Sequence, residues 1–90
     1  MFKDRAEPRK VMMARVEVRW EDQAGGAHNA TAMLEDRSLG GACLRLGKPI
    51  AVETRLQVRN HGQEFSGIVR HCHARGLEFV VGIQRDVVTG

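Results

Sequence analysis

Apolar and polar residues alternate along most of this chain, and glycine-containing turns interrupt the alternation. Between Arg15 and Trp20, for example, the apolar side chains of Val16, Val18 and Trp20 alternate with charged side chains. A period of two is typical of a β-strand that buries one face, whereas an amphipathic helix repeats every three to four residues. The pattern therefore predicts a β protein.

Six short strands joined by tight turns favour a β-barrel or a β-sandwich. The strands are expected at Arg15–Trp20, Asn29–Glu35, Ala42–Leu46, around Leu56 and Val58, at about Phe65–His73, and in a last segment in which Leu77, Phe79, Val81 and Ile83 face one way. Gly82 in that last strand allows a bend or a close backbone approach. The chain has no internal repeat or linker-like stretch, which indicates one domain.

Two features of the charged residues bear on function: where the positive charge lies and which residues carry it. The 90 residues carry a net charge of +3, and all of the surplus falls in residues 1–19, where six basic residues face three acidic ones. Arginine outnumbers lysine by 11 to 3. Because a guanidinium group binds phosphate, or the O6 and N7 atoms of guanine, through two parallel hydrogen bonds, this bias suits planar recognition.

The sequence predicts a cytoplasmic protein. No apolar run approaches the ~20 residues of a membrane span, and the N-terminus lacks the apolar stretch of a signal peptide. Cys43 and Cys72 are expected as reduced thiols, which fits that compartment better than a disulfide does.

Two short motifs hold the candidate chemistry. The first, R-x-x-x-R, consists of Arg5 and Arg9, and the second, D-x-S-x-x-G, consists of Asp36, Ser38 and Gly41. A carboxylate can accept hydrogen bonds from the N1 and N2 donors of guanine, and a serine hydroxyl can donate to phosphate or brace a turn. The glycine pair that ends the second motif, residues 40–41, is expected to allow positive φ and a close approach of the backbone to a ligand.

Both motifs together, in this order, resemble the signature of the PilZ family of bacterial cyclic di-GMP receptors. The resemblance covers roughly the whole chain and implies a six-stranded antiparallel β-barrel, residues 11–90, preceded by a flexible ligand-binding arm, residues 1–10. Cyclic di-GMP would be clamped between the arm and the barrel wall. Arg5 and Arg9 would contact phosphate and guanine, and Asp36, Ser38 and Gly41 would hold the ligand from the other side.

Two further residues matter under this resemblance. Relatives that bind a stacked pair of ligands have a basic residue directly before the first motif arginine, whereas this chain has Asp4 there, so one bound ligand per chain is expected. Arg70 lies in a region where relatives sometimes supply an additional ligand contact, and it is a secondary candidate.

Simpler explanations exist for each feature. The two arginines of the arm can be solvated charges on a disordered terminus, and the D-x-S-x-x-G segment can be only a turn, although a rigid turn can also bind a ligand. Trp20 continues the apolar phase of its strand, so core or rim packing is expected rather than base stacking. His71 and His73 should point to one face of a strand and Cys72 to the other, and no C-x-x-C pair is present, so no metal site is predicted.

The sequence contains no G-x-S-x-G elbow, P-loop or H-E-x-x-H motif, which favours binding over catalysis. Three functions remain open. The first is a cyclic di-GMP receptor that signals to an unidentified bacterial effector protein when the arm folds onto the barrel. The second is a ligand-independent adaptor of the same fold. The third, a barrel that binds RNA or single-stranded DNA, has few stacking platforms, because the chain has one tryptophan, three phenylalanines and no tyrosine.

Overall fold

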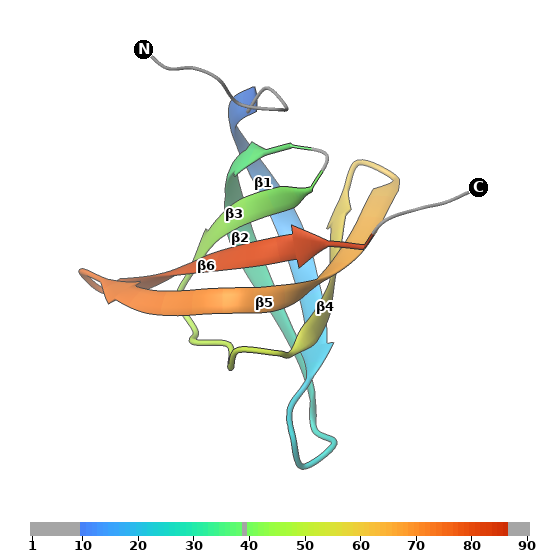
Figure 1. Ribbon diagram of the computed structural model, residues 1–90, viewed down its shortest axis with the longest axis vertical. Coiled ribbons are helices and arrows are strands. Elements are labelled where there is room, and N and C mark those ends of the chain that lie inside the picture. The colour runs from blue at the N-terminus through green and yellow to red at the C-terminus, as the bar shows by residue number, and fades with distance from the viewer. Residues whose placement is uncertain (1–9, 39, 87–90) are drawn as a thin grey trace.

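The computed structural model describes residues 10–38 and 40–86, with side chains from Met13 onward, and this part of the chain is an antiparallel β-barrel (Figure 1). The strands are β1 (Lys10–Glu21), β2 (Ala27–Arg37), β3 (Gly41–Leu46), β4 (Arg55–Asn60), β5 (Gln63–Arg75) and β6 (Glu78–Arg85). They follow one another around the barrel in the order β1-β2-β3-β6-β5-β4, and β4 pairs with β1 to close it. The predicted six-stranded antiparallel barrel is confirmed.

Every second side chain of a strand points inward, and these apolar side chains fill the barrel interior. In β1 the side chains of Val16, Val18 and Trp20 are buried, and those of the intervening charged residues are exposed. Val18 lies opposite both Ala30 of β2 and Val58 of β4, so the second half of β1 is paired on both edges. The core that results is wholly apolar among the described residues and consists of Val16, Val18, Trp20, Ala32, Leu34, Ala42, Leu44, Leu46, Ile50, Leu56, Val58, Val69, Val81 and Ile83.

The β4–β5 hairpin illustrates how local sequence sets the strand connections. The two residues between the strands, His61 and Gly62, have φ values of 51° and 82°. Positive φ at both central positions defines the type I′ turn, whose twist matches that of an antiparallel strand pair. The sequence Asn60-His61-Gly62 therefore forms a tight connection from β4 to β5.

One predicted core position is wrong. Leu77 was expected to face inward with Phe79, Val81 and Ile83, but its side chain is 98% exposed. The reason is that β5 extends to Arg75 and β6 begins only at Glu78, which leaves Leu77 in the turn of a long hairpin. Val81 and Ile83 are buried as predicted, and Phe79 is half-buried.

Three strands contain an irregularity in their pairing. The register shifts between Val11 and Ala14 in β1, between Leu34 and Asp36 in β2, and between Val69 and His71 in β5. Such β-bulges bend a strand and re-aim its side chains. The described residues include no helix suited to crossing a bilayer.

Candidate functional site

The D-x-S-x-x-G segment is the connection between β2 and β3 and lies at one end of the barrel (Figure 1). Asp36 is near the end of β2 and pairs with Cys43 of β3. The amide N–H of Ser38 donates to the carbonyl oxygen of Gly41 at 2.8 Å and closes the loop. The structure therefore brings Asp36, Ser38 and Gly41 together, as the motif predicted. Asp36 is part of β2 rather than of the loop, because β2 continues to Arg37.

Gly41 packs closely against the backbone of β6 and does not adopt positive φ. Its φ lies outside the left-handed region, so the expected positive φ is wrong for this residue. A Cβ atom added at Gly41 would lie 3.1 Å from the carbonyl oxygen of Ile83 in β6. Gly41 also lies opposite Gln84, so the absence of a side chain lets β6 approach the loop closely.

Arg85 holds the motif loop in place from β6, and sequence reasoning missed it. Its backbone N–H donates to the Gly40 carbonyl oxygen at 3.0 Å, and its Nη1 atom donates to the Ser38 carbonyl oxygen at 3.0 Å. The guanidinium carbon lies 4.4 Å from the centroid of the Phe65 ring, a cation–π contact. Because Arg85 is 47 residues from Ser38, only the pairing of β3 with β6 brings them together, and no local signal announces it.

Two arginines lie at the barrel end beneath the loop. Burial, followed by the repulsion of the nearby Arg37 guanidinium, lowers the pKa of Arg85 below its ordinary value, but an arginine remains charged at neutral pH. Arg37 and Arg85 line a hollow of about 280 Å³ together with Asn60, Phe65 and the acidic Glu64. The lining of the hollow therefore carries two positive charges and one negative charge.

Arg70 lies on the same outer surface. It extends from β5 across β6, where its Nε atom donates to Gln84 Oε1 at 2.7 Å and its Nη1 atom contacts Glu53 Oε2 at 2.8 Å. Since Gln84 is opposite Gly41, Arg70 is separated from the motif loop by a single strand, β6. Two of its donors are engaged within the protein.

Arg5 and Arg9 lie outside the described residues. The strand that follows them is informative, however, because Val11 lies opposite Asp36 and Lys10 lies opposite Arg37. The chain thus enters the barrel beside the carboxylate of the second motif. Arg9 precedes Lys10 by one residue and Arg5 precedes it by five. Only a short length of chain therefore separates the two arginines from Val11, the residue opposite Asp36.

His71 and His73 project from the outer face of β5, and Cys72 packs partly against the core, as predicted. The two imidazole rings are stacked, with centroids 6.0 Å apart and an interplanar angle of 19°. Within the described residues, neither cysteine is part of a disulfide. Within residues 10–38 and 40–86, no group of three or more histidine, cysteine or acidic side chains is placed to hold a metal ion.

Comparison with protein families gives a match to the PilZ domain over residues 3–88, a range that contains both motifs. The chain belongs to the PilZ family. Comparison with curated proteins gives no match.

Solved PilZ structures share the fold of this PilZ domain at low sequence identity. The PilZ domain of YcgR from Escherichia coli, determined with c-di-GMP, aligns with 92% of this chain and 78% of its own length, at 18% identity and a TM-score of 0.63. MrkH of K. pneumonia, determined as a c-di-GMP complex, aligns with 94% of this chain at 18% identity and a TM-score of 0.62. The present chain spans 45% of the length of that MrkH chain.

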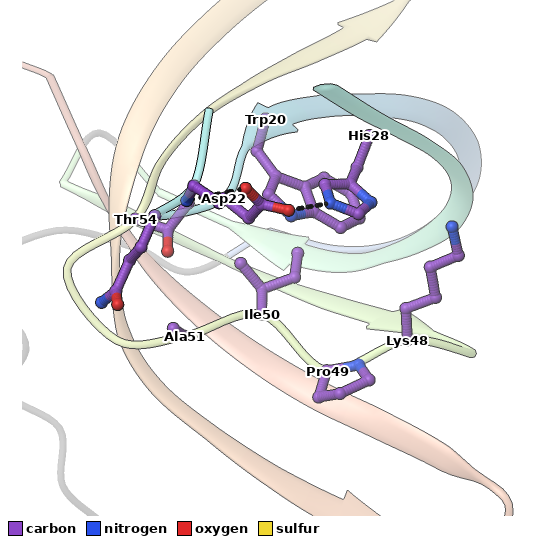
Figure 2. A pocket seen from close by; sticks show the side chains of 10 residues that line it. Trp20, Asp22, His28, Lys48, Pro49, Ile50, Ala51 and Thr54 are labelled. Carbon is purple, nitrogen blue, oxygen red and sulfur yellow. Dashed lines mark hydrogen bonds and ion pairs between the residues drawn. The ribbon is translucent and has the colours of Figure 1, made fainter. Parts of the chain in front are cut away.

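A second hollow, of about 600 Å³, lies at the opposite end of the PilZ barrel from the motif loop, between the β1–β2 turn and the β3–β4 connection (Figure 2). Trp20 forms part of its wall, is 8% exposed and stacks on His28 with ring centroids 5.3 Å apart. The predicted packing role of Trp20 is confirmed. Asp22 Oδ2 lies 2.7 Å from His28 Nε2, as the dashed line in Figure 2 shows, so its carboxylate ties the turn to β2.

Proposed function

We propose that this PilZ domain is a receptor for cyclic di-GMP and that it binds the dinucleotide between residues 1–10 and the β2–β3 loop. The observation that carries the proposal is the register of β1 on β2. Val11 lies opposite Asp36, so Arg9 is only two residues from a position paired with the second motif. Support comes also from the family match and from the c-di-GMP complexes among structural neighbours.

Each motif residue has a role that follows from its chemistry. The carboxylate of Asp36 accepts from the N1 and N2 donors of guanine, and the Ser38 hydroxyl donates to the ligand. Arg5 and Arg9 supply planar forks for phosphate oxygens or for O6 and N7 of guanine. The paired positive charges of Arg37 and Arg85 beneath the loop add a field that attracts the phosphates.

Binding would couple to a change in the N-terminal arm. Charge-assisted hydrogen bonds to the ligand must offset the conformational entropy lost when residues 1–10 are fixed, a cost of about 1–2 kcal/mol per residue. The ordered arm and ligand together form a new surface beside β2, which an effector protein can recognise. This function is one of binding rather than catalysis, and a bacterial cytoplasm is the compartment in which we place it.

Titration calorimetry tests the proposal directly. We expect wild-type protein to bind one cyclic di-GMP per chain, and we expect Arg5→Ala, Arg9→Ala and Asp36→Ala each to lose at least ~1.5 kcal/mol, as for other hydrogen bonds to charged groups. Arg19→Ala is the matched control, because Arg19 is exposed near the end of β1, opposite Asn29 and away from the motif loop. Two ligands per chain would contradict the stoichiometry, and unchanged affinity in the arginine variants would contradict their roles.

The same experiment separates the other two functions. An adaptor that needs no ligand would show no heat with cyclic di-GMP, yet would retain a partner in a pull-down. A nucleic-acid-binding barrel would prefer a single-stranded oligonucleotide over cyclic di-GMP, with an affinity that falls steeply with salt concentration. GTP serves as the control for guanine recognition without the cyclic dinucleotide.

A further inference from the structure

The far half of the β5–β6 hairpin has one edge without a partner strand. β4 pairs with β5 only from Gln63 to Ile68, whereas β6 pairs with β5 as far as Arg75. The β3–β4 connection adds two backbone hydrogen bonds at Val69, of 2.8 and 2.9 Å, and none beyond it within the described residues. The hairpin therefore projects past the strand that covers this edge, toward the left in Figure 1. Residues 72–75 of β5 are called the open edge below.

The hairpin turn determines which backbone groups face outward along the open edge. The turn has two residues, of which only Gly76, the first, has a positive φ (64°), as in a type II′ turn. The residues that flank such a turn, Arg75 and Glu78, exchange both hydrogen bonds, and the pairs alternate from there. The N–H and C=O groups of Cys72 and Ala74 therefore point away from β6. None of them makes a backbone hydrogen bond within residues 10–38 and 40–86.

The open edge lacks the features that usually prevent strand addition. Proteins protect edge strands with proline, with lysine or with a bulge that twists the edge away. Residues 72–75 contain neither proline nor lysine, and the bulge of β5 lies before them, between Val69 and His71. His73, Ala74 and Arg75 are exposed. Unpaired donors and acceptors on an exposed strand form a template for another strand.

The side chains of the open edge favour an acidic partner strand. His73 and Arg75 lie on its outer face, and residues 70–75 include no acidic residue. Arg75 makes no ion pair within the described residues, and Glu78, which lies opposite it, contacts Arg45 Nε at 3.2 Å instead. Opposite charges directly across two strands stabilise the pairing, and like charges destabilise it. A carboxylate is therefore the best neighbour for Arg75 on an added strand.

A second copy of this chain fits the open edge poorly. Because Cys72 and Ala74 present the outward groups, two antiparallel open edges would pair with these even-numbered residues opposite one another. Each such register places His73 opposite His71, His73 or Arg75 of the second copy. These pairs bring together only cationic or neutral side chains. The open edge therefore favours a different chain.

We propose that the open edge of β5 is a docking site for an extended acidic segment of a partner protein, which adds to the sheet as a strand. In this mode of recognition the main chain supplies affinity and alternate side chains supply specificity. Bonds to Cys72 and Ala74 fix the register, and acidic side chains of the segment face His73 and Arg75. The exposed Leu77 offers apolar surface at the end of the edge. The inference goes beyond the proposed function, because this docking requires no cyclic di-GMP.

An NMR titration of the full chain tests the charge preference. The probe is a capped synthetic peptide of about six residues, a common strand length, in which glutamate and threonine alternate. Binding should move the amide proton resonances of Cys72 and Ala74 downfield and slow their hydrogen exchange. Arg75→Glu should weaken binding at least about fivefold. Arg19→Glu is the matched control, since it reverses a charge on a strand paired on both sides, and it should stay within about twofold.

Two modified peptides test the backbone contacts without a change in the protein. If glutamates face His73 and Arg75, the threonine N–H groups bond to β5 and the glutamate N–H groups face away. N-methylation of the threonines should therefore weaken binding at least about tenfold, and N-methylation of the glutamates should leave it within about threefold. Ala74→Pro, which removes an outward donor from an edge position, should weaken binding at least about fivefold. Urea unfolding checks that each variant folds.

Several outcomes would overturn the proposal. No binding of the acidic peptide would refute it, and equal binding of a lysine–threonine peptide would refute the preference for acidic segments. Equal affinities of the two N-methylated peptides would exclude strand addition. Dimers of the protein alone in sedimentation, dissociated by Ala74→Pro, would assign the open edge to a second copy instead. Each result is independent of whether the chain binds cyclic di-GMP.

Discussion

At the scale of single residues, glycine decides how closely β5, β6 and the motif loop can approach one another. Gly41, Gly67 and Gly82 all lie at paired positions next to β6 or within it, and a Cβ atom at any of them would meet a neighbour. The tightest backbone approach is at Gly67, where an added Cβ would overlap the Gln84 carbonyl oxygen and come within 2.5 Å of Ile83 Cγ2. Backbone atoms cannot move aside as a flexible side chain can.

Gly67→Ala should therefore destabilise the barrel, by about 1–3 kcal/mol, as overpacked core substitutions do. Gly47→Ala is the matched control, because no atom lies within 4 Å of a Cβ built on Gly47 and its φ is not in the left-handed region. That substitution should be neutral or stabilise by up to about 1 kcal/mol through the unfolded state. Urea unfolding of both variants measures the difference, and equal free energies of unfolding would contradict the packing argument.

Sequence alone predicted the contacts of single residues correctly where the residues involved are also close together in the sequence. Asp36, Ser38 and Gly41 are within six residues of one another, so a local motif could predict that they form one loop. Arg85 could not be found in this way, since its contact with the Ser38 carbonyl depends on barrel closure. Leu77 was misassigned because apolar alternation continues into the β5–β6 turn, and alternation alone does not mark where a strand ends.

At the scale of elements, one carboxylate braces the turn between β1 and β2. Asp22 Oδ1 accepts from the backbone N–H groups of Ala24 and Gly26 at 2.9 and 2.8 Å, and Oδ2 contacts His28. The hydrogen bond with His28, followed by the one with Gly26, lowers the pKa of Asp22 below its ordinary value. The Asp22 carboxylate therefore links the turn, the start of β2 and the stacked Trp20–His28 pair at the far end of the barrel.

A lowered pKa in the folded protein makes stability depend on pH with a definite sign. The contribution of Asp22 is fully present above the pKa of about 3.9 that an aspartate has in an unfolded chain, and it is lost as the pH falls through the lower folded value. Asp22→Asn keeps an acceptor for the two N–H groups but cannot titrate. Between pH 5 and pH 3, its free energy of unfolding should fall less steeply than that of wild type.

Trp20, the only tryptophan, reports this unfolding by its fluorescence. Glu21→Gln is the control, because it removes a neighbouring exposed carboxylate that does not contact the hairpin turn. If Asp22→Asn and wild type lose stability in parallel over this pH range, the Asp22–His28 interaction does not contribute to folding. A parallel loss in Glu21→Gln and wild type is the expected control result.

At the scale of the whole molecule, a closed barrel of this size leaves the outer surface as the place for a charged ligand. Apolar side chains fill the interior, and no polar or charged residue is buried within the described part of the chain. A dinucleotide with two phosphates would have to give up its hydration without compensation to enter such a core. The two ends of the barrel also differ, since the motif end gathers Arg37 and Arg85 and the far end presents the mostly apolar hollow beside Trp20.

The division into an arm and a barrel leads to a prediction for the whole chain. The described core begins at Val16, with Ala14 packed against it, and every strand has both neighbours within residues 10–86. A chain that starts at Lys10 should therefore keep its free energy of unfolding to within about 0.5 kcal/mol, as expected for changes outside the core. It should lose cyclic di-GMP binding, because Arg5 and Arg9 are removed. Failure of this chain to fold would show that residues 1–9 are part of the barrel, and wild-type affinity would show that the ligand is held by the β2–β3 loop without the arm.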